Sequence, residues 1–265
     1  MVDRPDASLA EVTATDGPFL FLSPHLDDAV LSCGALMRWL ASSRPVEVVT
    51  AFTAAGPPPH TYAARSFLRT CATPDAGALF ARRRAEDRAV LDRLGVTHAH
   101  LGYPDALFRR RAGGTALGRR AGRILPELVH RYPTYRFDIA KGRIARGDRT
   151  LIAEVTAAVR DRVRQTGARW LFCPLGVGRH ADHLIARAAG ERFPDRVVYY
   201  ADFPYIRWAA PDPEFLARHG LVRSSWTAGI GAKEELIRGY GTQVGSMFPD
   251  GRIPTAPESY YRPPS

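Results

Sequence analysis

The sequence has few cysteines, and their positions suggest no shared structural role. Cys33, Cys71 and Cys173 lie far apart in a chain of 265 residues, and no Cys-x-x-Cys pair occurs. A disulfide framework needs paired cysteines, and a thiolate zinc site needs clustered ones. The pattern argues against both kinds of site, and a cytoplasmic location fits the sequence best.

Long apolar runs are also missing. No segment approaches the run of about 18 apolar residues that suggests a membrane-spanning helix, and residues 1–17 are polar and charged, unlike a secretory signal. No Ser/Gly-rich linker or internal repeat divides the chain. With 45% hydrophobic residues the chain can form a sizeable core. We therefore expect a single domain over residues 1–265, with residues 1–17 as a flexible N-terminus.

Lysine is nearly absent, although the formal net charge is +10 and the sequence pI is about 10.0. Only Lys141 and Lys233 occur, and the arginines are spread along the chain with short clusters at 82–84, 109–111 and 119–120. Abundant arginine, alanine, glycine and proline are typical of genome-wide codon bias, which is our first interpretation. A substrate carrying phosphate or carboxylate comes second. Nucleic acid comes third, because no nucleic-acid motif surrounds the arginines.

One short segment near the N-terminus combines a buried strand with three polar side chains. Residues 19–22 are apolar and predict a strand, and a helical pattern begins at Ala29. His25, Asp27 and Asp28 therefore lie in a strand-to-helix turn, at the edge where open α/β sheets bind ligands. A helix cap with a loop histidine would explain one aspartate, but not this combination. A divalent metal would neutralise the carboxylates and accept the imidazole lone pair.

A second cluster, His180-Ala181-Asp182-His183, follows a predicted strand at 170–174 and opens a helix. The remaining predicted strands are 45–52, 97–102 and 197–201, and the predicted helices include 79–94, 151–166 and 232–240. Strands that alternate with helices predict an α/β fold with a mostly parallel sheet and helices on both faces. Both clusters then lie at the carboxyl ends of strands, on the same edge of the sheet.

Together the two clusters predict a catalytic metal site. His25, Asp28 and His183 supply two imidazoles and one carboxylate, which leaves a position open for water. The metal would lower the pKa of that water toward about 7. Asp27 could take the proton of the water as general base, and His180 could stabilise an oxyanion or protonate a leaving amine. This arrangement predicts metal-assisted attack on a carbonyl group, without specifying which carbonyl.

The two clusters also resemble the signature motifs of the PIG-L/LmbE-like de-N-acetylase family. The matching segments are Ser23-Pro24-His25-Leu26-Asp27-Asp28 and His180-Ala181-Asp182-His183, and the resemblance extends through 83–86, 101–105, 174–178 and 202–205. Ala181 stands where the family usually has proline. The longer form of the first motif, residues 23–32, most resembles the branch of glycopeptide-antibiotic N-acetylglucosaminyl deacetylases.

The resemblance implies a Rossmann-like fold and a zinc-dependent hydrolase that removes acetyl from an aminosugar-containing small molecule or glycoconjugate, in specialised metabolism. His25, Asp28 and His183 would bind Zn²⁺ or another divalent metal. Asp27 would be the general base and His180 its electrostatic or acid partner. No nucleic-acid partner is expected.

Further roles follow from the resemblance alone. Arg83 and Asp105 would contact the substrate, although Arg83 could instead pair with Glu86 and Asp105 could cap a turn. Asp182 would orient one of the histidines, or it could be an ordinary carboxylate at a helix start.

Two long segments, 54–77 and 109–149, match nothing in the family that we can place. The first follows the carboxyl end of a strand, so it could shape a substrate pocket. Within the second, residues 138–148 are expected to form an exposed loop. Both segments would carry substrate specificity.

Two other functions fit parts of the sequence. An amidase could use the same metal site to cleave a different acyl group or a conjugate amide. A basic nucleic-acid-binding protein with a structural metal, or none, would account for the net charge. The open ligand set disfavours the second alternative, since structural zinc sites usually have four protein ligands.

Overall fold

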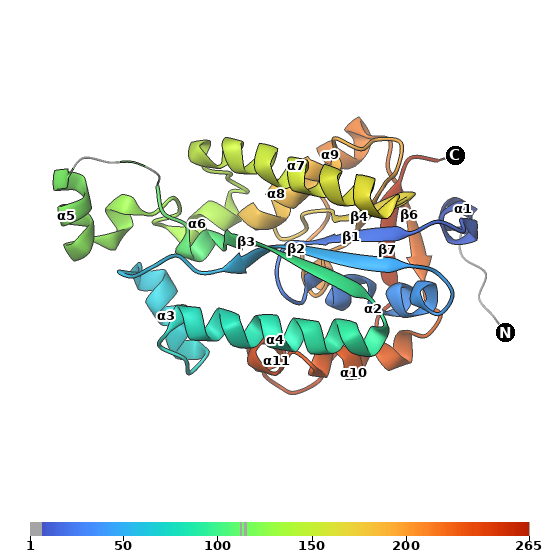
Figure 1. Ribbon diagram of the computed structural model, residues 1–265, viewed down its shortest axis with the longest axis horizontal. Coiled ribbons are helices and arrows are strands. Elements are labelled where there is room, and N and C mark those ends of the chain that lie inside the picture. Colours follow the sequence, from blue (N-terminus) through green and yellow to red (C-terminus); the bar gives the residue numbers. More distant parts are fainter. Residues whose placement is uncertain (1–6, 112, 114–115, 265) are drawn as a thin grey trace.

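The computed structural model describes residues 7–111, 113 and 116–264 of the chain (Figure 1). The described strands join one sheet in the order β3-β2-β1-β4-β5-β7-β6. They are β1 (Phe19–Ser23), β2 (Val46–Ala54), β3 (Thr97–Pro104), β4 (Trp170–Pro174), β5 (Val197–Tyr200), β6 (Val222–Trp226) and β7 (Glu258–Arg262). All pairs from β3 to β5 are parallel, and β7 is antiparallel to both of its neighbours. The predicted α/β class with a mostly parallel sheet is confirmed. A single domain over the whole chain stays a prediction.

Helices occupy both faces of the sheet (Figure 1). The α-helices are α1 (Ala7–Ala14), α2 (Asp28–Ala41), α3 (Tyr62–Thr70), α4 (Ala76–Leu94), α5 (Ala116–Ile124), α6 (Tyr135–Ala140), α7 (Arg149–Thr166), α8 (Ala181–Gly190), α9 (Pro213–Arg218), α10 (Lys233–Arg238) and α11 (Gly241–Met247). Short 3-10 turns are η1 (Ala106–Phe108), η2 (Pro126–Val129), η3 (Arg146–Asp148), η4 (Tyr205–Arg207) and η5 (Ile230–Ala232). Among the residues described, no helix combines the length and hydropathy needed to cross a membrane.

The alternation of side chains along β1 explains the two helical layers. Phe19 and Phe21 face the core that includes α2 and α10, whereas Leu20 and Leu22 face the core that includes α7 and α8. All four side chains are buried. A central parallel strand buried on both faces reads as a continuous apolar run, which is why this strand was recognisable in the sequence.

The order of the strands determines where a ligand site can form. From β1 the chain continues to β2 on one side, and from β4 it continues to β5 on the other side. β1 and β4 are direct neighbours, with Phe19 paired to Trp170 and Phe21 to Phe172. This point, where the strand order reverses, leaves a crevice beyond the carboxyl ends of the two strands. The loops that follow β1 and β4 carry the two His/Asp clusters, so the predicted common edge is confirmed.

Part of the expected flexible N-terminus is helical. Residues 7–14 form α1, and its Leu9 and Val12 are fully buried in the same core as Trp170. Burial of these two apolar side chains holds the segment to the sheet, which corrects the prediction for residues 7–14. Residues 1–6 lie outside the described residues.

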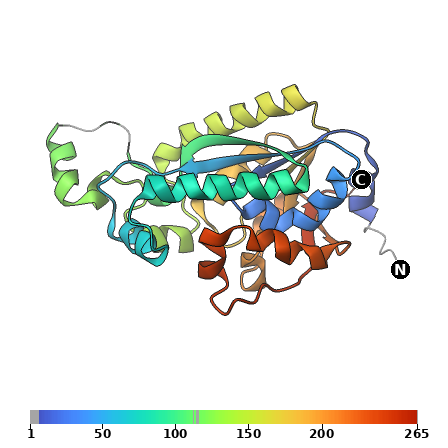
Figure 2. The ribbon, with the colours of Figure 1, turned by 60° about the horizontal axis from the view of Figure 1, so that its bottom comes forward.

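The long segments also contain structure that the sequence did not indicate. Helix α3 forms within 54–77, and it buries Ala64 and Leu68. In the second segment, α5, η2, α6 and η3 form a lobe (residues 116–148) that extends beyond the carboxyl edge of the sheet (Figures 1 and 2). The expected exposed loop at 138–148 is partly wrong, because its ends belong to α6 and η3 and because Asp138 and Asp148 are buried. Asp148 accepts hydrogen bonds from Tyr132, Arg109 and Arg131, which offset the cost of burying its charge.

Candidate active site

The loop after β1 is held by its own polar groups. The Ser23 hydroxyl donates to the carbonyl of His25 at 2.6 Å and accepts from the amide of Ala29 at 3.1 Å. The amide of His25 donates to Oδ2 of Asp28 at 2.9 Å. Asp27 occupies the N-cap position of α2, but its side chain makes no capping hydrogen bond. The simple helix-cap interpretation of Asp27 is therefore wrong.

The loop after β4 places the second cluster at the start of α8. Gly178 has a φ of +84°, and a Cβ there would lie 3.0 Å from the ring of Tyr205, so only glycine fits without strain. His180 caps α8, because its Nδ1 accepts from the amide of Asp182 at 3.2 Å. Ala181 is the first helical residue, a position where proline is also well accommodated. Alanine is therefore compatible with the start of this helix.

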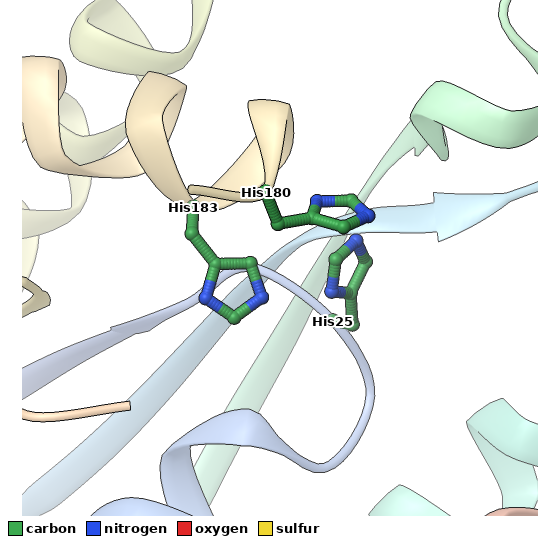
Figure 3. A group of neighbouring side chains, drawn as sticks. All are labelled: His25, His180 and His183. Carbon is green, nitrogen blue, oxygen red and sulfur yellow. The ribbon is translucent and has the colours of Figure 1, made fainter. Parts of the chain in front are cut away.

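Two imidazoles meet one carboxylate oxygen at the crevice. Oδ2 of Asp28 lies 3.0 Å from Nδ1 of His25 and 3.2 Å from Nε2 of His183. Figure 3 shows His25 on the loop after β1 and His183 on the first turn of α8, and their ring centroids are 5.2 Å apart. Burial alone would raise the pKa of Asp28, but the two histidines lower it well below its usual value. Burial would lower the pKa of His183, but Asp28 and Asp202 raise it to about 10.

A second carboxylate holds each of these histidines from behind. Oδ2 of Asp182 lies 3.1 Å from Nε2 of His25, and Oδ1 of Asp202 lies 2.6 Å from Nδ1 of His183. These contacts orient Nδ1 of His25 and Nε2 of His183 toward Asp28. Asp182 lies in the first turn of α8 and also contacts His25, so both of its predicted interpretations agree with its position, and its role in orienting a histidine stays a prediction. The contact of Asp202 was not predicted, although its position just past β5 was a usable signal.

The donor set fits a divalent metal. Nε2 of His183 is buried without a hydrogen-bond partner, since its contact with Asp28 lacks hydrogen-bond geometry. The spacings of 3.0 and 3.2 Å are close to the about 3.3 Å expected between two ligands of a tetrahedral zinc with bonds of about 2.0–2.1 Å. Two other groups have ligand atoms that all lie within 4.8 Å of one another, His25 with His180 and His183, and His25 with Asp105 and Asp182. The set of His25, Asp28 and His183 instead rests on the two contacts to Oδ2 of Asp28.

The further groups are less suited to bind a metal. Both ring nitrogens of His180 already have partners, the amide of Asp182 and the hydroxyl of Tyr135. Both carboxylate oxygens of Asp182 accept hydrogen bonds as well, from Arg109 and from the amide of Ala106. The assignment of His25, Asp28 and His183 as the metal ligands stays a prediction.

Asp27, the predicted general base, lies beside this set. It is 7% exposed and lines the cavity, and no donor in the described part of the chain hydrogen-bonds to its carboxylate. Burial and the neighbouring charge of Asp28 raise the pKa of Asp27 to about 7, against the opposing effect of Arg83. A carboxylate with this pKa can accept and return a proton near neutral pH.

The two residues assigned to the substrate lie at the same cavity. Arg83 is 8% exposed, its Nε has no hydrogen-bond partner, and its guanidinium stacks over Phe67 at 5.2 Å. Its suggested pairing with Glu86 does not form, because Glu86 accepts from the amide of Thr242 at 3.0 Å.

Asp105 has two contacts that combine both of its predicted interpretations. Its Oδ1 caps η1 by accepting from the amide of Leu107 at 2.8 Å, and its Oδ2 lies 3.5 Å from Nε2 of His25. Burial raises the pKa of Asp105, against the opposing effect of His25. Asp105 therefore caps η1 with one carboxylate oxygen while the other oxygen still faces His25.

Arg109 is a buried part of the site that the sequence did not reveal. It is 3% exposed, pairs with Asp182 and, at 2.7 Å, with Asp148, and lies 4.8 Å above the ring of Phe52. In the sequence it belongs to an arginine cluster, which gave no sign of burial. This arginine is not available to nucleic acid.

A cavity of about 840 Å³ opens above these residues. Its walls include Tyr62 and Phe67 of α3, Phe137 of α6, and Tyr205 and Met247. The long segments 54–77 and 109–149 therefore both line the cavity. For the segment 54–77, this agrees with the expectation that it could shape a substrate pocket.

The chain is similar to known proteins over most of its length. A family model described as PIG-L, GlcNAc-PI de-N-acetylase, matches residues 20–193. A 2'-N-acetylparomamine deacetylase from Streptomyces fradiae is 28% identical over 253 residues, covering 91% of this chain and 78% of the relative. One of the same name from Niallia circulans is 26% identical over 252 residues, covering 87% and 82%. The zinc-inhibited form of teicoplanin deacetylase Orf2 superposes with a TM-score of 0.69 at 23% identity, covering 92% of this chain and 97% of that one.

Proposed function

Because the chain belongs to the PIG-L family of GlcNAc-PI de-N-acetylases, we propose that it is a metal-dependent hydrolase that removes an N-acetyl group from an aminosugar-containing small molecule or glycoconjugate in specialised metabolism. The observation that carries the proposal is the convergence of His25 Nδ1 and His183 Nε2 on Oδ2 of Asp28, beside the free carboxylate of Asp27. The names of the relatives, 2'-N-acetylparomamine deacetylase and teicoplanin deacetylase, support it.

His25, Asp28 and His183 would hold the metal, and zinc is the first candidate because two imidazoles and a carboxylate are among its usual ligands. When bound, the metal lowers the pKa of a water molecule and polarises the acetyl carbonyl. Asp182 and Asp202 keep the two histidines in the orientation that directs their lone pairs toward the ion.

The proton transfers fall to Asp27. Its carboxylate accepts a proton from the attacking water as the new C–O bond forms at the acetyl carbon. As the C–N bond breaks, Asp27 returns this proton to the leaving nitrogen, so acetate and a free amine are the products. His180, which lines the same cavity, is the electrostatic partner of Asp27, and Arg83 and Asp105 contact the sugar.

We expect Asp202→Asn to weaken zinc binding by about 10-fold to 100-fold, because the His183 ring loses its negatively charged partner. Zinc affinity is measured by competition with a chromogenic chelator. Asp161→Asn, at an exposed position of α7, is the matched control and should bind zinc as the wild type does. An unchanged zinc affinity in Asp202→Asn would exclude this role.

The proposed activity is tested by measuring acetate release from N-acetylglucosaminides, free and linked to lipid or glycopeptide, and from an N-acetylated aminoglycoside. Protein depleted of metal should be inactive, and added zinc should restore turnover. Release of another acyl group, with acetate absent, would favour the amidase alternative. No turnover from any substrate by zinc-loaded protein would overturn the proposal. The cytoplasmic location and the identity of zinc as the bound metal stay predictions.

A further inference from the structure

Tyr135 brings a hydroxyl group into direct contact with the second His/Asp cluster. It is the first residue of α6, in the lobe, and its Oη lies 2.5 Å from Nε2 of His180. Its ring meets the imidazole of His180 edge-on, with centroids 5.7 Å apart. Tyr135 also lines the cavity together with His25, Asp27 and Asp28.

The direction of this hydrogen bond follows from the other nitrogen of the ring. Nδ1 of His180 faces the amide of Asp182 at 3.2 Å, and an amide N–H can only donate. Nδ1 therefore carries the lone pair, and the proton of the neutral imidazole is on Nε2. It follows that His180 donates to Tyr135, and that the hydroxyl oxygen of Tyr135 accepts.

Two consequences follow for the site. The single N–H of His180 is occupied by Tyr135, so His180 has no hydrogen left to donate to a substrate. The O–H of Tyr135, in contrast, remains available, since in the described part of the chain its hydroxyl has no other hydrogen-bond partner. A hydroxyl that accepts one hydrogen bond becomes a better donor of its own.

The hydroxyl also stays protonated. Burial, together with the nearby carboxylates of Asp105 and Asp182, raises the pKa of Tyr135 well above its usual value. A neutral donor beside a cavity wall is the kind of group that stabilises the negative charge of a carbonyl oxygen during acyl transfer.

We propose that Tyr135 is a catalytic residue, whose hydroxyl donates a hydrogen bond to the acetyl oxygen as that oxygen gains negative charge, and that His180 is a positioning residue acting through it. The inference rests on the proposed deacetylation. It adds no proton transfer, because Tyr135 keeps its proton and Asp27 carries the proton from water to amine. Tyr135, a residue of the lobe, thereby joins the catalytic groups that the two His/Asp clusters supply.

The test is Tyr135→Phe in the full chain, loaded with zinc. We expect kcat for acetate release to fall about 100-fold to 1,000-fold, as for loss of one oxyanion donor, with KM nearly unchanged. Zinc affinity should match the wild type, since the ligands are not touched. Tyr199→Phe is the matched control, because its buried hydroxyl has no hydrogen-bond partner and lies on β5 against Phe215.

A tetrahedral inhibitor separates a catalytic from a structural role. We expect a methylphosphonamidate analogue of the amino sugar to lose affinity for Tyr135→Phe by the same factor as kcat/KM falls. Unchanged kcat, or a rise in KM alone, would overturn the inference and leave the proposed function intact. Loss of zinc in Tyr135→Phe would also overturn it, because the tyrosine would then be structural. A wild type without activity would overturn the proposed function, and this inference with it.

Discussion

Asp27→Asn is expected to lower kcat for acetate release by about 100-fold to 10,000-fold, the range for loss of a general acid–base group. The amide has the shape of the carboxylate but cannot accept a proton from water. The carboxylate of Asp27 has no hydrogen-bonded donor among the described residues, so the substitution breaks no hydrogen bond within the protein. The measurement is kcat on the best substrate of the panel, with zinc content determined on the same sample.

The zinc content decides how the result for Asp27 is interpreted. We expect Asp27→Asn to hold zinc as tightly as the wild type, because His25, Asp28 and His183 are unchanged. Asp250→Asn, on an exposed turn, serves as a control for the loss of one carboxylate. Full activity in Asp27→Asn would rule Asp27 out as the base. Loss of activity together with zinc would instead make Asp27 a ligand.

Replacing Arg109 with methionine is expected to cost about 3–5 kcal/mol of the free energy of unfolding, the usual cost of removing one member of a buried ion pair. Arg109 lies between Asp148 and Asp182, both fully buried, and its Nε and Nη2 also donate to the carbonyl of Pro104 at 3.1 and 2.9 Å. Methionine fills part of the volume of the Arg109 side chain, but it removes the positive charge that lies beside the carboxylates of Asp148 and Asp182.

The neighbouring Arg110 is the matched control for Arg109. It is half-buried and pairs with no carboxylate among the described residues, so Arg110→Met should change the free energy of unfolding by no more than about 0.5 kcal/mol. Denaturant unfolding of both variants measures the difference. A cost below about 1 kcal/mol for Arg109→Met would show that the carboxylates are satisfied without it.

The convergence of the two His/Asp clusters could be predicted because the residues of each cluster are local in sequence. His25, Asp27 and Asp28 lie within four residues, and the apolar run before them defines the strand that carries them. The same holds for His180 and His183 after β4. Two such clusters at strand ends of a parallel sheet must share an edge, so the sequence alone was enough to bring them together.

The residues that complete the site could not be predicted, because their roles depend on contacts distant in sequence. Tyr135 is 45 residues from His180, and Asp148 is 39 residues from Arg109. Neither Tyr135 nor Asp148 belongs to a periodic hydrophobic pattern that would predict a helix or a strand. The lobe is also rich in arginine. A segment of this composition is expected to be an exposed loop, and only the structure shows that some of its charged side chains have buried partners.

The last two strands were missed for a similar reason. β6 reads Val-Arg-Ser-Ser-Trp and buries only Ser224 and Trp226, and β7 buries the charged Glu258. Lys233 pairs with Glu258 at 3.0 Å, and the amides of Ala35 and Leu36 donate to the same carboxylate. A carboxylate buried in a strand is expected only once its partners are seen. Lys233, the first residue of α10, is therefore used inside the protein.

The place of β7 in the sheet has a consequence for how the protein is made. β7 is the last of the described strands along the chain, yet it lies between β5 and β6. During synthesis on the ribosome, β6 therefore emerges before the strand that joins it to the sheet, and the edge of β5 stays unpaired until then. An unpaired strand edge is a template for association with other chains. We expect nascent chains arrested before residue 258 to be held by chaperones or to aggregate, whereas chains that include β7 close the sheet.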